Sequence, residues 1–415
     1  MGISADMRVD IDRFWSTIEA SAKVGQGRPG GLSRLTLSDS DREMRDVFAG
    51  WCKEAGLTVS VDEVGNMFAR RDGRDNSLAP ILIGSHLDTQ INGGRFDGIA
   101  GVLAGLEVLR QLNDAGHHTK RPIVVVNWTN EEGARFSPPM VASGCFVGKY
   151  SAAWTKDRIG DDGTRFGDEL ERIGYAGPDV CKAGDIDAYY ELHIEQGPIL
   201  DAERRDVGIV VGGYPSHGMR ASFSGRTAHT GPTPMNLRQN ALVAGARWLT
   251  SIDDIGWEYA VYDGKATAAR LTAWPNKPGI LSDTAEAVCD VRHPDLATTK
   301  VMAEKMRRAL FESAAKTGCT ATIEDEWQWG GDIFDTNLVQ GLREQAIRME
   351  FNWRDIHSQA GHDAYHLALH CPTAMIFTPC KDGITHNNEE HCEPEDFVAG
   401  LNILFHAVIG RADRD

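Results

Sequence analysis

This chain lacks several features that would place it in a particular class of protein. No apolar run approaches the roughly 18 residues of a membrane-spanning helix, and the start, MGISADMRVDIDRF, has no apolar signal core. The eight cysteines among 415 residues are scattered and form no Cys-x-x-Cys pair, which argues against a disulfide framework. We therefore expect a soluble, cytoplasmic protein with reduced thiols.

Positive charge is also scarce. The chain has 43 basic and 60 acidic residues, a net charge of −17, which disfavours nucleic acid and anionic membranes as partners. The hydrophobic content of 41% and charged content of 25% are typical of a globular protein. Because the chain is too long for one ordinary core, we expect two domains.

Strands and helices alternate through the first 211 residues and again after residue 330. Apolar runs predict buried strands at 81–83, 121–128, 188–194 and 373–377. Helical spacing of apolar residues predicts helices around 11–18, 44–51, 99–112, 338–351 and 394–409, while 57–61 and 67–70 read as a short meander and 143–187 as a helical region. A strand–helix–strand order of this kind predicts an α/β sheet.

The pattern changes between residues 212 and 329. Predicted strands at 219–223, 266–274, 286–292 and 320–327 enclose helices at 236–252 and 297–316, in the β-α-β-β-α-β order of a ferredoxin-like sandwich. We therefore predict an α/β protein in which a catalytic domain (1–211 and 330–415), with a central mixed sheet flanked by helices, carries an inserted ferredoxin-like α+β lid and dimerisation domain (212–329).

Histidine and carboxylate side chains follow four of the predicted strands. Open α/β sheets place their active sites at the carboxyl ends of strands, and these side chains are common metal ligands. Taken singly, each has a plainer explanation: a surface turn at 86–88, an acidic helix start at 131–132, or a core histidine at 193. Together they make a two-metal set with Asp97 as the bridge: His86, Asp97, Glu132, His193 and His386.

Six segments resemble a known family, in the family's order: SHLDTQINGGRFDGIAG, TNEEGARF, ELHIEQGP, AHTGPTPM, DVRHPD and GITHN. The chain resembles the metal-dependent aminoacylase and carboxypeptidase superfamily. Within it, the chain is similar to the branch of N-carbamoyl-L-amino-acid amidohydrolases, β-ureidopropionases and allantoate amidohydrolases.

The resemblance implies roles at a dinuclear centre. One metal would be held by His86, Asp97 and His193, and the other by Asp97, Glu132 and His386. Asp88 would fix the ring of His86, and Glu131 would be the general base that takes a proton from the water between the metals and delivers it to the leaving nitrogen. These ligands suit Zn²⁺, with Mn²⁺, Co²⁺ and Ni²⁺ as alternatives.

The resemblance also implies a substrate pocket. Arg292 would grip the substrate carboxylate with its planar fork, although an exposed salt bridge is an alternative for this residue. Gln196 would contact the scissile amide, Asn276 would line the pocket, and Gly383 would offer its backbone N–H to the carboxylate. His229 would stabilise the oxyanion from the lid of the partner subunit, so the family role of this residue implies a homodimer.

Three places depart from the family: Gly279 and the segments GGYPSHGMR and SQAGHDAYH. Gly279 stands where family members usually have asparagine, so a polar contact to the substrate carboxylate is missing. We predict a hydrolase of the ureido or amide C–N bond of an N-carbamoyl-L-amino acid or N-carbamoyl-β-alanine. The alternatives are an aminoacylase- or peptidase-like hydrolase of another N-acyl amino acid, and a non-catalytic small-molecule binder, which would have no need of Glu131.

Overall fold

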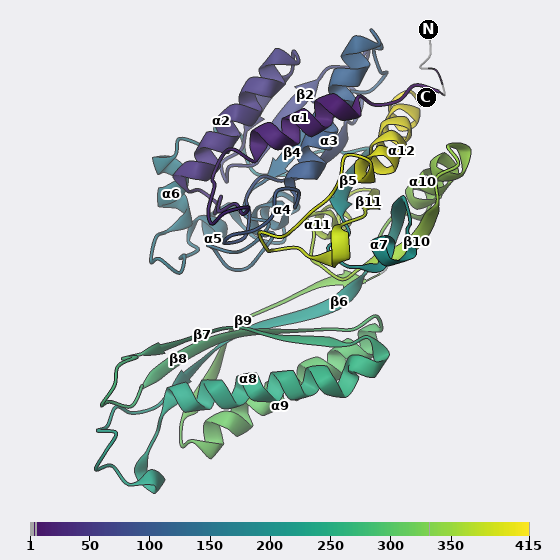
Figure 1. The fold of residues 1–415 in the computed structure, drawn as a ribbon. Coiled ribbons are helices and arrows are strands. Elements are labelled where there is room, and N and C mark those ends of the chain that lie inside the picture. Colours follow the sequence, from purple (N-terminus) through teal and green to yellow (C-terminus); the bar gives the residue numbers. More distant parts are fainter. Residues whose placement is uncertain (1–3, 5, 332, 415) are drawn as a thin grey trace. The chain divides into compact units, whose positions relative to one another are not determined.

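The computed structural model describes residue 4, residues 6–331 and residues 333–414, in two compact units (Figure 1). Unit 1 comprises Met1–Gly212 with Asp332–Asp415, and unit 2 comprises Gly213–Gly331. The catalytic, lid and dimerisation roles that the sequence suggested for these parts remain predictions.

A mixed sheet runs through unit 1. Its strands lie in the order β1 (Thr58–Val61), β2 (Met67–Arg71), β4 (Ile123–Trp128), β3 (Ile81–His86), β5 (Ala188–Ile194), β11 (Thr373–Thr378) and the start of β6 (Val207–Ser224). The four central strands β4, β3, β5 and β11 are parallel, and β1, β2 and β6 run antiparallel to their neighbours. Every residue of the parallel strands is buried, as expected for strands covered by helices.

The helices of unit 1 pack on this sheet and on one another. α3 (Ile99–Asp114) contacts β3, β4 and β5, and both α1 (Ile11–Ser21) and α12 (Asp396–Ala412) pack against α3. The side chains of Asp10 and Ser38 cap α1 and α2 (Asp39–Glu54) by accepting backbone N–H bonds in the first turn. The remaining helices are α4 (Val141–Phe146), α5 (Ala152–Lys156), α6 (Phe166–Arg172), α7 (Ile199–Glu203), α10 (Thr336–Arg348), α11 (Ala364–Leu367) and the 3₁₀ turn η3 (Lys381–Gly383).

Unit 2 is a four-stranded antiparallel sheet with two helices. The strands lie in the order β9 (Thr320–Gly331), the rest of β6, β8 (Thr284–Arg292) and β7 (Lys265–Trp274). α8 (Ala241–Tyr259) and α9 (Leu296–Lys316) pack together over a core that includes Phe223, Trp248 and Met306. Two 3₁₀ turns, η1 (Met235–Leu237) and η2 (Ala260–Tyr262), complete the unit, whose chain order is the predicted β-α-β-β-α-β.

The predicted α/β fold class is confirmed, but one predicted strand was wrong in extent and another strand was missed. β6 is a single strand of 18 residues rather than 219–223. β10 (Trp353–Ser358), which pairs with β6, was not predicted, because its sequence WRDIHS has few apolar side chains and only Ile356 and Ser358 are buried. Across the described residues, every helix is too short or too polar to cross a membrane.

Candidate metal centre

The carboxyl ends of the parallel strands bring the candidate ligands together. His86 is the last residue of β3 and lies in register with Trp128 at the end of β4. His193 of β5 lies in register with Phe377 near the end of β11. The turns beyond these ends carry the other candidates, so residues 300 positions apart in sequence meet at one edge of the sheet (86 to 386).

His86, Asp97 and His193 form the first group, with ligand atoms all within 4.8 Å of one another. Asp97 Oδ1 lies 3.2 Å from His193 Nε2 and 3.8 Å from His86 Nε2. The other ring nitrogen of each histidine lies 2.9 Å from a backbone carbonyl, that of Asp88 for His86 and that of Ile194 for His193. An Nδ1–H that donates to these carbonyls leaves a lone pair on Nε2 of both rings, which on His193 accepts from the Gly98 N–H at 3.2 Å and would have to turn to a bound metal.

Asp97, Glu132 and His386 form the second group. His386 Nε2 lies 3.0 Å from Asp97 Oδ2 and 3.3 Å from Glu132 Oε2. The two oxygens of Asp97 therefore face different groups, which is the arrangement a bridging carboxylate requires. The His386 side chain is 45% exposed, whereas those of Asp97 and Glu132 are 4% exposed.

Glu131 is buried beside the first group. Its Oε2 lies 3.4 Å from His86 Nε2. Burial raises the pKa of Glu131 well above its ordinary value, and the nearby charges of Asp363 and Glu132 raise it further. A carboxyl group whose pKa is raised toward neutrality can both accept and return a proton, as a general base must.

Asp88 links the turn after β3 to the turn after β4. The Thr36 hydroxyl donates to Asp88 Oδ2 at 2.6 Å, and the backbone N–H groups of Glu131 and Glu132 lie 3.4 Å from its two oxygens. Its own backbone carbonyl accepts from His86. Asp88 therefore lies where it orients His86 and both glutamates rather than among the ligand atoms.

The ionisation of the group suits a divalent cation. Burial lowers the pKa of His86 to about 4, so its ring is neutral. Burial raises the pKa of Glu132 to about 8, helped by the charge of Asp97. Burial also acts to lower the pKa of His193 and His386, but the nearby carboxylates outweigh it and raise them to about 9 and about 10. A divalent cation bound by these nitrogen and oxygen ligands would balance the buried carboxylates and would release the protons from the two histidines.

Three supporting residues escaped the sequence reasoning. Glu390 accepts from the backbone N–H of Asp97 at 3.2 Å, and the Thr385 hydroxyl donates to Asp97 Oδ2 at 3.2 Å. Gln90 donates to both carboxylate oxygens of Glu132, through its backbone and its side chain, at 3.0 Å each. The only signal for them was their place within or just beyond the motif segments.

Gly98 adopts a conformation that only glycine tolerates well. Its φ of 68° and ψ of −54°, with Ile99 N donating to Asp97 O at 2.7 Å, define a γ-turn of positive φ. A Cβ added to Gly98 would lie 2.2 Å from Cε1 of His86. The glycine therefore lets the bridging carboxylate and the first histidine approach each other.

A further group, Glu191, His193 and His362, shares His193 with the first. The carboxylate of Glu191 already accepts from the Ser85 hydroxyl at 2.8 Å and from the Ala364 N–H at 3.1 Å. These bonds favour a supporting role for Glu191 at the strand ends over a role as a metal ligand.

Two of the predicted substrate residues lie in unit 1. Gln196 Nε2 donates to Asp97 Oδ2 at 2.9 Å, so this side chain lies at the ligand cluster. The Gly383 N–H donates to the Cys380 carbonyl at 3.0 Å. Its predicted donation to a substrate carboxylate would require that bond to be shared or broken.

The other three lie in unit 2 and stay predictions. Arg292, at the end of β8, donates through Nε to Asp290 Oδ1 at 3.0 Å. His229 is exposed and its Nδ1 accepts from the Gly231 N–H at 3.0 Å. Asn276 is exposed in the turn after β7.

Comparison with known proteins confirms the family resemblance. The model of peptidase family M20/M25/M40 matches residues 82–409. An N-carbamoyl-L-amino-acid amidohydrolase of Rhizobium meliloti is 41% identical over 98% of this chain and 97% of its own length. An allantoate amidohydrolase of Bacillus subtilis is 28% identical over 93% of this chain and 94% of its own. The crystal structure of an amidase of the hydantoinase/carbamoylase family from Burkholderia vietnamiensis has a TM-score of 0.96 and 43% identity, covering 99% of this chain and 100% of that one.

Proposed function

The chain belongs to peptidase family M20/M25/M40, and we propose that it hydrolyses N-carbamoyl amino acids, of the L-amino acid or β-alanine type, to the amino acid, carbon dioxide and ammonia. The observation that carries the proposal is the buried carboxyl of Glu131 beside two groups of histidine and carboxylate ligands. The relative of 41% identity, named for this activity, supports the substrate class.

We propose that the two ligand groups hold one divalent cation each, with Zn²⁺ first and Mn²⁺, Co²⁺ or Ni²⁺ as alternatives. When bound, such cations lower the pKa of water to roughly 7 and polarise a carbonyl. The residues that would hold them are His86, Asp97 and His193 for one, and Asp97, Glu132 and His386 for the other.

The proton transfers fall to Glu131. Hydrolysis of a ureido C–N bond needs a base to take a proton from the attacking water and an acid to protonate the leaving nitrogen. A single carboxyl with a raised pKa can do both in turn, and Glu131 is held for this by the bond between its backbone and Asp88.

We propose that the substrate carboxylate is bound by Arg292, with Gln196, Asn276 and Gly383 as further contacts. His229 of the partner subunit would supply a contact to the developing oxyanion, in a cytoplasmic homodimer. Exposed apolar side chains in unit 2 support self-association through a symmetric surface: Trp257, Val261, Tyr262 and Trp274. All eight cysteines are free thiols, which supports a reducing compartment.

A substrate panel tests the proposal. The metal-loaded protein is incubated with N-carbamoyl-L-amino acids and N-carbamoyl-β-alanine, and ammonia is measured, with the Glu131→Gln variant as the control. We expect the unmodified protein to release ammonia and the Glu131→Gln variant to release none. No ammonia from any of these compounds would overturn the carbamoyl assignment.

The second candidate is an aminoacylase-like hydrolase of other N-acyl amino acids. Gly279 favours it, because this residue is exposed, has a φ of 88° and has no atom within 4 Å of where a Cβ would lie. It offers no side chain to a carbamoyl substrate. Release of amine without ammonia from N-acetyl or N-formyl amino acids in the same panel would identify this activity.

A further inference from the structure

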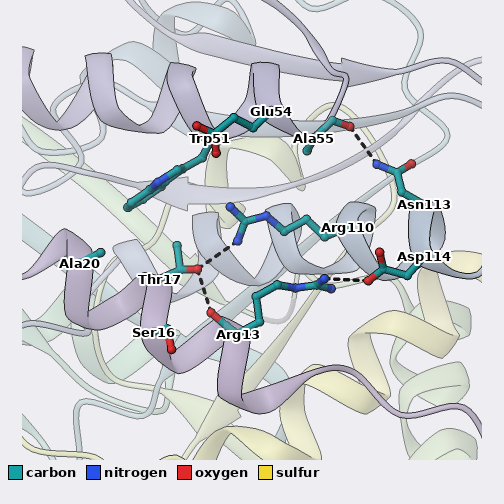
Figure 2. A pocket seen from close by; sticks show the side chains of 10 residues that line it. All are labelled: Arg13, Ser16, Thr17, Ala20, Trp51, Glu54, Ala55, Arg110, Asn113 and Asp114. Atoms are coloured by element: carbon teal, nitrogen blue, oxygen red, sulfur yellow. Dashed lines mark hydrogen bonds and ion pairs between the residues drawn. The ribbon is translucent and has the colours of Figure 1, made fainter.

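A groove in unit 1 lies at the far end of α3 from the metal centre. It has a volume of about 460 Å³, in the range of small-molecule sites, and lies between α1, α2 and α3 (Figure 2). Arg110 in this groove is eleven residues after Ile99, which follows the Asp97–Gly98 turn, or about 16 Å along the helix axis. The residues that matter are Arg13, Thr17, Trp51, Glu54, Arg110 and Asp114.

The two arginines of the groove are unequally paired. Arg13 forms ion pairs with two carboxylates and donates hydrogen bonds of 2.6 and 3.0 Å to Glu107 and of 2.7 Å to Asp114. Arg110, whose side chain is 17% exposed, donates one hydrogen bond among the described residues, to the Thr17 hydroxyl at 3.0 Å. Its nearest carboxylate oxygen, on Glu107, is 3.8 Å away. The guanidinium therefore keeps most of its five N–H groups for another anion.

Burial and crowding make this positive charge costly. Burial lowers the pKa of Arg110, and the neighbouring charge of Arg13 adds to that effect, while the charges of Glu107 and Glu54 oppose it. An anion placed on the guanidinium would form charge-assisted, two-pronged hydrogen bonds and relieve the repulsion between the arginines. The groove thus favours a carboxylate at Arg110.

The opposite wall comes from α2 and carries a negative charge. Figure 2 shows the Arg110 guanidinium in the middle of the groove, with Trp51 and Glu54 on one side and Thr17 and Arg13 on the other. Glu54 is exposed and forms no ion pair with the described residues, so its charge attracts that of Arg110 only at longer range, across the groove. The indole of Trp51 adds an apolar surface.

We propose that this groove binds an α-amino acid as a zwitterion, with the carboxylate on Arg110, the ammonium at Glu54 and the side chain along Trp51. Arg110 and Glu54 face one space and form no ion pair with each other, so they are complementary to a ligand that carries both charges. That the natural ligand is the amino acid released by the reaction rests on the proposed function. The binding itself does not.

Calorimetric titration of the metal-loaded protein with L-methionine tests the proposal. The wild type should show a site that Arg110→Gln weakens at least about tenfold, equal to roughly 1.4 kcal/mol. The matched control is Arg42→Gln, which removes an exposed positive charge from the same helix as Trp51 and should leave the affinity for L-methionine unchanged. Equal affinity and stoichiometry in the wild type and Arg110→Gln would overturn the proposal.

Two further arms separate the causes. Glu54→Gln, at an exposed position where folding is not at risk, should weaken the binding of L-methionine. It should not weaken the binding of 4-(methylthio)butanoate, which lacks the ammonium group. An equal loss of affinity for both compounds would refute the role of Glu54. Initial rates of N-carbamoyl-L-methionine hydrolysis should be equal in the wild type and Arg110→Gln. Absence of hydrolysis in both would overturn the proposed function and leave the binding result standing.

Discussion

Replacement of Gly98 by alanine should disable the first ligand group while leaving the fold in place. The positive φ costs an alanine about 1–3 kcal/mol. The added Cβ would lie 2.2 Å from the His86 ring, and ordinary contact begins at 3.4 Å, so the ring or the turn must move by the difference of 1.2 Å. Metal–ligand distances tolerate only about 0.2 Å. We therefore expect metal affinity at this group to fall at least about 10- to 100-fold, as when a ligand's orientation is lost.

The assay counts bound metal per subunit by mass spectrometry after dialysis against a graded series of free Zn²⁺, with hydrolysis measured in parallel. Gly105→Ala is the matched control, because it makes the same chemical change in α3 and places a Cβ 3.0 Å from Val125 Cγ1, away from every candidate ligand. It should lower the unfolding midpoint through overpacking and keep the metal. If Gly98→Ala bound metal as tightly as the wild type, the argument that this glycine lets His86 and Asp97 share one ion would be refuted.

Three other predictions concern the same centre. Asp97→Asn should lower the bound metal from two ions per subunit toward none, whereas Glu132→Gln should leave one ion, as counted by the same dialysis; equal losses would contradict a bridging role for Asp97. Glu131→Gln should lower kcat by about 10²- to 10⁴-fold with unchanged metal content, and loss of metal instead would make this residue a ligand. His193 and His386 have pKa values of about 9 and about 10 without metal, so both are protonated at pH 7. Metal binding must displace these protons, and metal affinity should therefore rise from pH 6 toward pH 9. Calorimetry in buffers of different ionisation enthalpy measures the number of protons released.

The convergence of the ligands could be predicted because each lies at the end of a recognisable strand or in the segment that follows one. The strands that end at His86, Trp128, Ile194 and Thr378 are mostly apolar and wholly buried, and parallel packing brings their ends to one edge. The sequence was therefore sufficient to predict which residues lie together at the site, but not the distances between their atoms.

The supporting contacts could not be predicted in the same way. Glu390, Thr385 and Gln90 act through single hydrogen bonds from turns, and a turn has no periodicity that would show which way a side chain points. The strand β10 was missed for a related reason, since a half-exposed strand with two charged residues carries little hydrophobic signal. Patterns of burial are readable from sequence, whereas the geometry of individual polar contacts is not.

The two ligand groups differ in their access to water. The histidines of the first group are 2% and 1% exposed, whereas His386 of the second is 45% exposed. The first group is therefore the more enclosed, and we expect an ion held there to exchange more slowly than one held by the second group. A chelator should then yield a half-loaded enzyme, and refilling it with a second kind of metal would create a mixed pair whose composition records the order of addition.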